Sequence, residues 1–352
     1  MDRFIETGGS ASPPSTPGAP SVKYPTQGDP LTATPASKPG EWWFHMIQES
    51  MRRVLVAAGI TPDYSNLDLL TTAIQAINAA GLSLTNDFRL TLTNGTPVTT
   101  ADVVGATTVY MTPYKSNRIA LYNGTSWVMY NTAQLSLALG TLTNDQGYDV
   151  FCYANSGVPT LEILAWSNNT TRATALVYQD GVLCKSGALT RRYVGSFLTT
   201  STTTTEDSAS KRYVFNYNNR VSRPQTRIDG NATWSYNNST VRQARGSSSN
   251  QLNFFIGVVE NPIDYFLTAN SQSGTSTSAY NGIGLNSTSA YTNGTACSSG
   301  ASNDYLSNTV SGSLYPTLGK NYVAWLEWTG GAVTFSGTNG DSLSMLAVRG
   351  LA

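Results

Sequence analysis

The pattern of hydrophobic and polar residues changes twice along the chain, and its first part has no periodicity. Residues 6–40 are rich in Pro, Gly, Ser and Thr. Proline fixes φ and removes a backbone donor, so residues 1–40 are expected to form neither a helix nor a central strand. Two interpretations stay open: a disordered tail, or an extended arm that becomes ordered against a partner. Val22, Tyr24 and Leu31 favour an anchoring arm, because a solvated tail would not need these apolar residues.

Helical periodicity begins at Glu41. Residues 41–58 contain no Gly or Pro, and their apolar residues recur at intervals of three and four, as on one face of a helix. Gly59 is expected to end this helix as its C-cap, and Pro62 prevents its continuation.

A second helix is expected to run through about Ala80. Asp63 or Ser65 would cap its N-terminus and Gly81 would end it. The apolar residues on one of its sides are Leu67, Leu70, Ile74 and Ile77. Residues 41–81 are therefore expected to form a short helical segment.

Two helices of this length can bury little against each other, although Trp42, Trp43 and Phe44 add a large apolar load. One interpretation is association between chains, for example in a small trimeric bundle. The other is packing of the helices on the chain's own β-domain. We favour trimerisation, through Trp42, Trp43, Ile47, Met51, Val54, Leu70, Ile74 and Ile77.

From Leu82 onward, short apolar segments alternate with turn signals and no long helical pattern returns. Asn-Gly at 94–95 and 123–124 and Asp-Gly at 180–181 separate such segments, which is a strong hairpin signal. A further strand pair is expected around residues 157–159.

The fold class is therefore expected to be mainly β. An extended arm and a short helical segment would precede two antiparallel β-sandwich or jelly-roll-like domains, residues 82–198 and 206–352. The polar run TTSTTTT at 199–205 marks either the boundary between them or a long loop.

The second β-region contains long segments rich in Ser, Thr, Asn and Gly between residues 268 and 313. Loops of this kind carry recognition surfaces in many β-proteins. Tyr265, Tyr280, Tyr291 and Tyr305 lie in or near them, and exposed tyrosine beside such residues is typical of a surface that binds sugar or protein. Ordinary loop packing is the alternative. Most tryptophans of the β-segments are expected in the core.

Composition narrows the classes of partner. Only 12% of the residues are charged, and 21 basic residues balance 21 acidic ones. A nucleic-acid partner is not expected, because binders of nucleic acid normally carry a basic excess or stripe. Membrane insertion is not expected either, because no apolar run reaches about 18 residues. The polar N-terminus does not resemble a signal peptide, and the widely spaced Cys152, Cys184 and Cys297 fit reduced thiols in a cytoplasm.

The sequence offers few groups for catalysis. His45 is the only histidine, and it lies in the first expected helix. The chain has no phosphate-binding loop, zinc-binding motif or nucleophile elbow. We therefore expect no enzyme activity, no cofactor and no metal site. A glycan-degrading enzyme stays as the alternative of another class, and it would need two acids facing each other across a groove.

Residues 24–50 (YPTQGDPLTATPASKPGEWWFHMIQES), followed by AAGITPD at 57–63, resemble the N-terminal attachment region of bacteriophage tail-fibre and related virion-appendage proteins. The resemblance covers residues 22–63 and little of the β-region. It implies a virion protein assembled in the host cytoplasm, a homotrimer attached by its N-terminus to other proteins of the tail or capsid. The outward β-region would contact a host surface glycan or protein.

The chain departs from long fibres because it has no sustained heptad repeat. A capsid decoration or head-fibre protein is therefore an alternative to a tail fibre.

Overall fold

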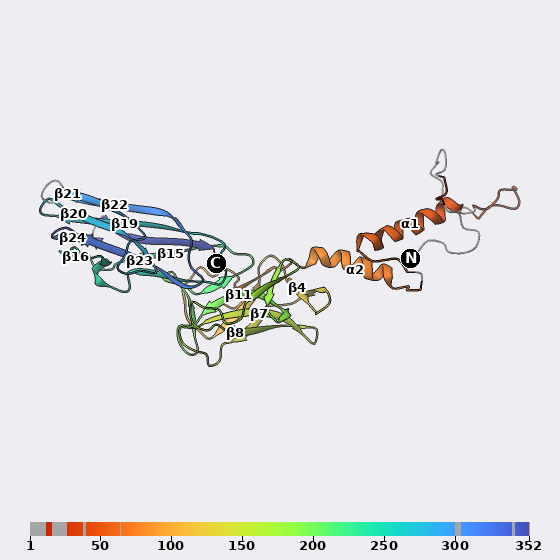
Figure 1. Cartoon of the computed structure of the whole chain (residues 1–352), viewed down its shortest axis with the longest axis horizontal. Helices are drawn as coiled ribbons and strands as arrows, with labels where there is room; N and C mark the ends of the chain where they lie inside the picture. Colours follow the sequence, from red (N-terminus) through yellow and green to blue (C-terminus); the bar gives the residue numbers. More distant parts are fainter. Residues whose placement is uncertain are drawn as a thin grey trace. The chain divides into compact units, whose positions relative to one another are not determined.

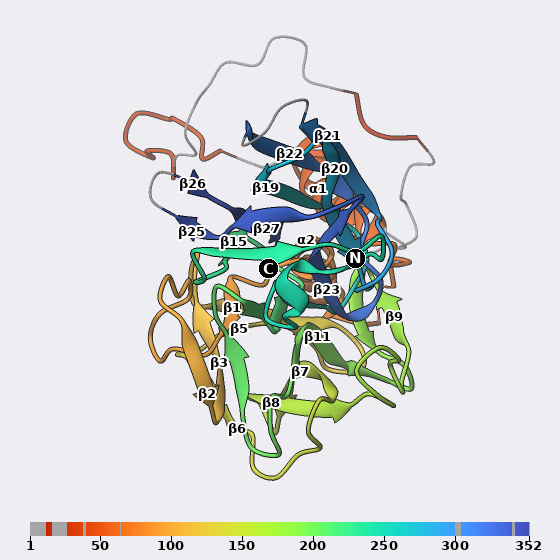
Figure 2. The same cartoon turned by 90° about the vertical axis from the view of Figure 1, so that its left-hand side faces the viewer.

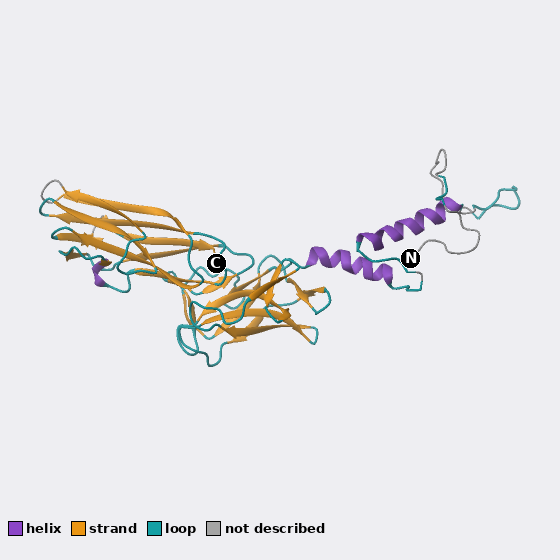
Figure 3. Cartoon of the chain, in the orientation of Figure 1, coloured by secondary structure: helices purple, strands orange, loops and turns teal. Residues whose placement is uncertain are grey.

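The fold is described from a computed structural model of the 352-residue chain. The structure describes residues 12–15, 27–37, 40–63, 65–299, 304–339 and 342–351. The chain divides into two compact units, which are described separately: the helical unit, Met1–Leu82, and the β-unit, Ser83–Ala352. As expected, the fold is mainly β, with antiparallel sheets of the sandwich or jelly-roll-like class (Figure 3).

The helical unit contains α1, Glu41–Ala57, and α2, Leu69–Leu82, which pack against each other. The prediction that Gly59 ends α1 is confirmed. Gly59 has a φ of 71°, its amide donates to Val56 O at 2.9 Å, and the Ile60 amide donates to Leu55 O at 2.9 Å. These two bonds form a Schellman motif, which satisfies carbonyls at the end of the helix.

The start of α2 differs from the prediction. Asp63 Oδ1 accepts from the Ser65 amide at 2.8 Å, and Asn66 Oδ1 accepts from the Asp68 amide at 2.9 Å. Two successive side-chain turns therefore replace the expected cap and delay the helix to Leu69. The helix also continues one residue past Gly81.

The described part of the arm contains a tight turn. Asp29 and Thr34 exchange backbone hydrogen bonds at 2.8 and 3.0 Å around residues 30–33. Leu31 lies within this turn and is 96% exposed. Val22 and Tyr24 lie outside the described residues.

Residues 88–198 provide the strands of the first half of the β-unit. They are β1 Phe88–Thr91, β2 Val103–Ala106, β3 Thr108–Pro113, β4 Arg118–Tyr122, β5 Trp127–Asn131, β6 Leu135–Ala138, β7 Gly147–Asn155, β8 Val158–Ala165, β9 Leu176–Gln179, β10 Val182–Lys185 and β11 Ala188–Leu198. One sheet has the order β1-β3-β6 and another the order β8-β7-β11-β10-β9, while β4 and β5 form a hairpin. Figure 1 labels β4, β7, β8 and β11 of this half.

Two of the three expected Asn-Gly or Asp-Gly hairpins are confirmed. Tyr122 pairs with Trp127 across the turn at 123–126, and Gln179 pairs with Val182 across Asp180-Gly181. The prediction at 94–95 is wrong, because β1 pairs with β3 and these residues lie in the loop before β2. The turn between β7 and β8 is at 156–157, one residue earlier than expected.

Residues 205–351 provide the remaining strands. They are β12 Thr205–Asp207, β13 Lys211–Arg212, β14 Val214–Asn216, β15 Ser222–Ile228, β16 Thr233–Tyr236, β17 Arg242–Gln243, β18 Gln251–Ile256, β19 Ile263–Ser273, β20 Thr277–Leu285, β21 Asn293–Ser299, β22 Asp304–Leu314, β23 Gly319–Thr329, β24 Val333–Ser336, β25 Thr338–Asn339, β26 Ser342–Leu343 and β27 Met345–Leu351. The short 3-10 helix η1 spans Ala244–Gly246.

Two of the later sheets form a sandwich (Figure 2). One has the order β15-β27-β19-β24-β16, with β22 also on β19, and the other joins β18, β23, β20 and β21. Residues alternate along β19 between buried and less buried positions, so one face points inward. Leu267 and Leu346 of the first sheet share a core with Val323 and Trp325 of the second.

Residues 199–205 do not separate two independent domains. β12, which starts at Thr205, pairs with β2, and β14 pairs with β11. The expected boundary between residues 198 and 206 is therefore a loop inside one compact β-unit, and later strands complete the earlier sheets. Two main hydrophobic cores nevertheless exist, one in each half.

Neither helix of the described chain has the length and apolar character needed to cross a membrane.

Candidate functional site

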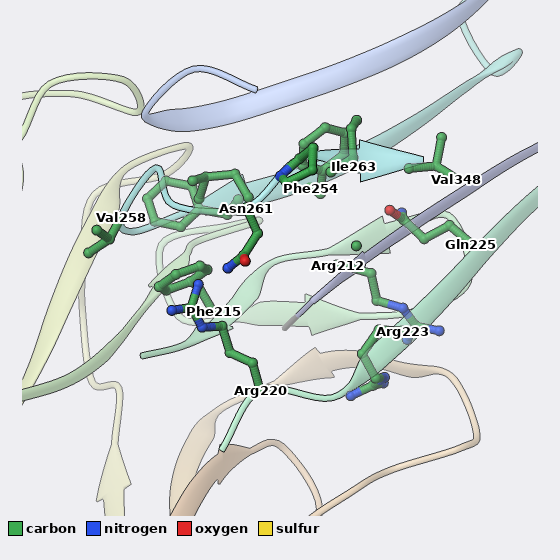
Figure 4. A pocket seen from close by; sticks show the side chains of 14 residues that line it. Arg212, Phe215, Arg220, Arg223, Gln225, Phe254, Val258, Asn261, Ile263 and Val348 are labelled. Carbon is green, nitrogen blue, oxygen red and sulfur yellow. The ribbon is translucent and has the colours of Figure 1, made fainter. Parts of the chain in front are cut away.

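A narrow pocket lies within the β-unit (Figure 4). It lies among β13, β14, β15, β18, the start of β19 and β27. Its polar lining residues are Arg212, Arg220, Arg223, Gln225 and Asn261, and its apolar ones include Phe215, Phe254, Phe255, Ile256, Val258, Ile263 and Val348. We call it the arginine pocket. Its cavity volume is about 30 Å³, which is space for about two water molecules.

Strand alternation directs two of these polar side chains inward. On β15, Arg223 and Gln225 are buried, whereas Ser222, Pro224 and Thr226 between and beside them are exposed. Antiparallel pairing sets Arg223 opposite Gly350 and Gln225 opposite Val348 on β27. Paired residues share a face of a sheet, so this face of β15 and β27 forms one wall of the pocket.

Two of the arginines share one carboxylate. Arg212 Nη1 donates to Asp207 Oδ1 at 3.1 Å, and Arg223 Nη2 donates to Asp207 Oδ2 at 2.9 Å. Both arginines are 8% exposed. Burial lowers the pKa of Arg223, and its proximity to Arg212 lowers it further, although Asp207 opposes both effects. One carboxylate thus neutralises only one of two buried cations.

Arg212 has an unused donor. Its Nη2 donates to the carbonyl of Pro224 at 3.0 Å, but its Nε is buried and has no hydrogen-bond partner in the described chain. An unsatisfied buried donor costs free energy, so its presence in a native site calls for an explanation.

Arg220 is the third cation of the pocket. Its guanidinium pairs with Glu260 and lies over the rings of Phe215 and Tyr217, at 5.6 and 5.8 Å from their centroids. Figure 4 shows Arg220 and Asn261 on the same side of the pocket as Phe215. Aromatic faces attract a guanidinium and hold it in place.

Arg220 also lines a second, wider pocket with a cavity volume of about 300 Å³. Arg192 lies in its wall and is 1% exposed. Its Nη1 donates to the carbonyls of Ser83, Thr85 and Ala120 at 2.8 to 2.9 Å. Burial lowers the pKa of Arg192 to about 10, so it stays charged at neutral pH.

The tyrosines predicted from the sequence do not form one surface. Tyr265 is buried in the sandwich core, and its hydroxyl accepts from Asn293 Nδ2 at 2.6 Å. The prediction that Tyr265 lies on a binding surface is therefore wrong, because β19 turns it inward. Tyr305 lies on β22 and is well exposed, so its role in binding stays a prediction.

Tyr280 and Tyr291 do lie together. The Tyr291 hydroxyl donates to Tyr280 O at 3.4 Å. The Tyr280 ring meets Trp328 edge-on, with centroids 4.8 Å apart and planes at 89°. Trp328 is only partly buried, unlike Trp325 in the core. This group is an aromatic patch on the sandwich, and its binding role stays a prediction.

The three cysteines form no disulfide. Cys152 and Cys184 are buried, and burial raises their pKa values to about 12 and 11. His45 lies in α1 beside Trp42, with ring centroids 5.5 Å apart. Within the described residues, no group of three or more His, Cys, Asp or Glu is arranged to hold a metal ion.

Neither of the two pockets has a carboxylate in its wall. Glycoside hydrolysis needs two acids on either side of the scissile bond. These pockets therefore give no support to the glycan-degrading alternative.

The arginine pocket was not predicted from the sequence. Its one local signal is the group Lys211, Arg212, Arg220 and Arg223, which has no acid between its members in a chain of low charge. Strand alternation could have turned any of these side chains to solvent. The sequence therefore indicates a cationic segment but not a pocket.

Comparison with known proteins gives no family. No family model and no curated protein matches the sequence. Solved structures with some likeness include Eiger TNF from S. frugiperda, at 8% identity and a TM-score of 0.29, covering 38% of this chain and 93% of that one. They also include the insecticidal δ-endotoxin Cry8Ea1 from Bacillus thuringiensis, at 9% identity and a TM-score of 0.24, covering 78% of this chain and 55% of that one.

A third is BuGH86 in complex with neoagarooctaose, at 9% identity and a TM-score of 0.22, covering 70% of this chain and 33% of that one. The chain thus spans about half the length of the endotoxin chain and a third of the BuGH86 chain.

Proposed function

We propose that this chain is a bacteriophage virion structural protein: a homotrimeric tail fibre or fibre-like appendage. It is attached by its N-terminal arm, associates through its helical unit and displays the β-unit to the host. The observation that carries the proposal is the apolar surface of α1 and α2.

Six large apolar side chains of these helices are each more than 40% exposed: Trp43, Phe44, Met46, Val56, Ile74 and Ile77. Only Leu55 and Ala73 are fully buried in the described part of this unit. Full burial of one such side chain is worth about 1.5–3 kcal/mol. The helical unit therefore has much apolar surface to gain by associating with copies of itself.

The members of the predicted trimerisation face differ in exposure. Trp43, Ile74 and Ile77 are exposed, whereas Trp42, Ile47, Met51, Val54 and Leu70 are half-buried. A face that is only half-covered within one chain is suited to completion by neighbouring chains. The trimeric order itself rests on the resemblance of residues 22–63 to virion appendages.

The proposed assembly also accounts for attachment to the virion and for contact with the host. Leu31 is an exposed apolar side chain in the turn of the arm and can enter a groove of a neighbouring virion protein. Several β-units in one assembly would bind the host multivalently, so that weak single contacts give firm adsorption. An electron cryomicroscopy map of the whole particle would show whether the protein is attached to the tail or to the capsid.

Light scattering of the purified protein tests association. Wild type is expected to have the mass of a trimer at micromolar concentration, and Trp43→Ala is expected to shift it towards monomer. Arg53→Ala, an exposed change on the same helix, is the control and should keep the trimer. A monomeric wild type would contradict the proposal.

A further inference from the structure

We propose that the arginine pocket binds the carboxylate group of an acidic sugar, such as a uronic acid. The inference rests on the proposed host attachment, and it names the chemistry of one ligand. Five features carry it: the charge of the pocket, the unsatisfied donor of Arg212, the size of the pocket, its rim and its edge strand.

Charge comes first. The wall contains Arg212, Arg220 and Arg223 and no acid. Asp207 and Glu260 pair with these arginines from outside the wall. One positive charge is left over in a chain whose formal net charge is zero. Apolar walls lower the local dielectric and strengthen attraction for an anion.

Arg212 also offers an unused hydrogen-bond donor. Arg212 is buried, and its Nε lacks a partner in the described chain. Because Arg212 lines the pocket, a carboxylate bound there would bring an acceptor to a residue that has an unsatisfied donor. Charge-assisted hydrogen bonds of this kind are roughly twice as strong as neutral ones.

The volume of the arginine pocket limits which anions can enter it. A volume of about 30 Å³ holds roughly two water molecules, which is close to the size of a planar carboxylate. A tetrahedral phosphate is bulkier and fits this volume less well. Phe254, Ile263 and Val348 belong to strands of the sandwich core and resist widening of the pocket.

The rim favours a sugar over an acidic peptide. Asn261, which is only partly buried, provides an amide that can bond sugar hydroxyls as donor or acceptor, whereas the buried Gln225 Nε2 already donates to Asn253 O at 2.8 Å. An extended peptide would add to the sheet edge at β15. Pro224, in the middle of that edge strand, has no amide hydrogen to offer such a peptide.

Calorimetric titration of the full protein with sodium glucuronate at low salt tests the proposal. Glucose is the uncharged match, and acetate, phosphate and hexaglutamate are the competing anions. Glucuronate is expected to bind at least tenfold more tightly than each of them. No glucuronate binding, or equal binding of glucose, overturns the proposal.

The competing anions show which class of ligand the pocket recognises. Equal binding of acetate or phosphate would indicate a general anion site and overturn the assignment to a sugar. Tighter binding of hexaglutamate would do the same in favour of an acidic peptide.

Two variants test whether glucuronate binds in the arginine pocket. Arg220→Gln is expected to weaken glucuronate binding at least tenfold, whereas Arg118→Gln, an exposed arginine paired with Asp87, should leave it unchanged. Asn261→Asp adds a negative charge to the wall at constant size and should also weaken binding. Asn237→Asp, at an exposed position, is its control. Unchanged binding in both pocket variants overturns the proposal.

Light scattering on the same samples separates the two proposals. A monomer that still binds glucuronate would contradict trimeric assembly and leave the pocket's ligand in place. A trimer that binds no glucuronate would contradict the pocket's ligand alone.

Discussion

The β-unit and the helical unit differ in how they bury their side chains. In the β-unit, Trp325 and Phe335 have no exposed surface, and the buried carboxylates of Asp149, Asp207 and Glu327 each accept hydrogen bonds from arginine. In the helical unit, most large apolar side chains of α1 and α2 stay at least partly exposed. We infer that one chain suffices to complete the β-unit, whereas the helical unit is completed by other chains.

The largest expected effect comes from the sandwich core. Trp325→Ala removes a fully buried ring that packs against Trp234, and it should lower the free energy of unfolding of the β-unit by roughly 3–5 kcal/mol. Chemical denaturation followed by circular dichroism measures this. Trp328→Ala, at a partly exposed position, should cost clearly less. Equal losses would show that the core is not where the strand alternation places it.

The next effect concerns a buried ion pair. Arg172 Nε and Nη2 donate to Asp149 at 2.7 and 3.0 Å, and the Ser196 hydroxyl donates to the same carboxylate at 2.8 Å. Asp149→Asn should cost roughly 3 kcal/mol, because it leaves the charge of Arg172 uncompensated. The exposed Asp264→Asn is the control. A loss below about 0.5 kcal/mol, as for ordinary surface changes, would mean that water screens this pair.

Substitutions in the helical unit should affect association between chains and leave the folding stability of the β-unit unchanged. Replacing Ile74 and Ile77 together with Ser should weaken association by about 1 kcal/mol for each half-exposed side chain, measured by light scattering over a dilution series. The unfolding midpoint of the β-unit should not move. A lower midpoint without any change in mass would mean that these residues stabilise their own chain.

The smallest effect is a pH dependence. Glu162 accepts hydrogen bonds from Lys185 and Arg191, each at 2.8 Å. Burial alone would raise the pKa of Glu162, but these two cations outweigh it and hold the pKa below 4.5. The resulting stability, roughly 0.5–1 kcal/mol for partly exposed pairs, is complete above pH 4.5 and is lost as the pH falls through the folded pKa.

Acid denaturation compares wild type with Glu162→Gln. The variant should lack this contribution at neutral pH and lose less stability than wild type as the pH falls below 4.5. Identical curves would show that the two pairs contribute nothing measurable.

Several features could be read from the sequence because short-range effects decide them. Gly59 ends α1 because only a residue that tolerates positive φ closes a Schellman motif easily. The turn at Asp180-Gly181 has positive φ at both positions, as a two-residue hairpin requires. Asn94-Gly95 carries the same local signal, but β1 pairs with β3 instead, and pairing across a longer loop is not encoded in a dipeptide.

Local sequence signals predicted the mainly β class, the two helices and most of the tight turns, since each depends on neighbours a few residues away. Packing between distant strands, which no local signal encodes, turns Tyr265 into the core and brings Arg212, Arg220 and Arg223 to one pocket. A side chain on a strand faces inward or outward according to which sheet covers it. That depends on pairings such as Arg223 with Gly350, between residues more than a hundred positions apart.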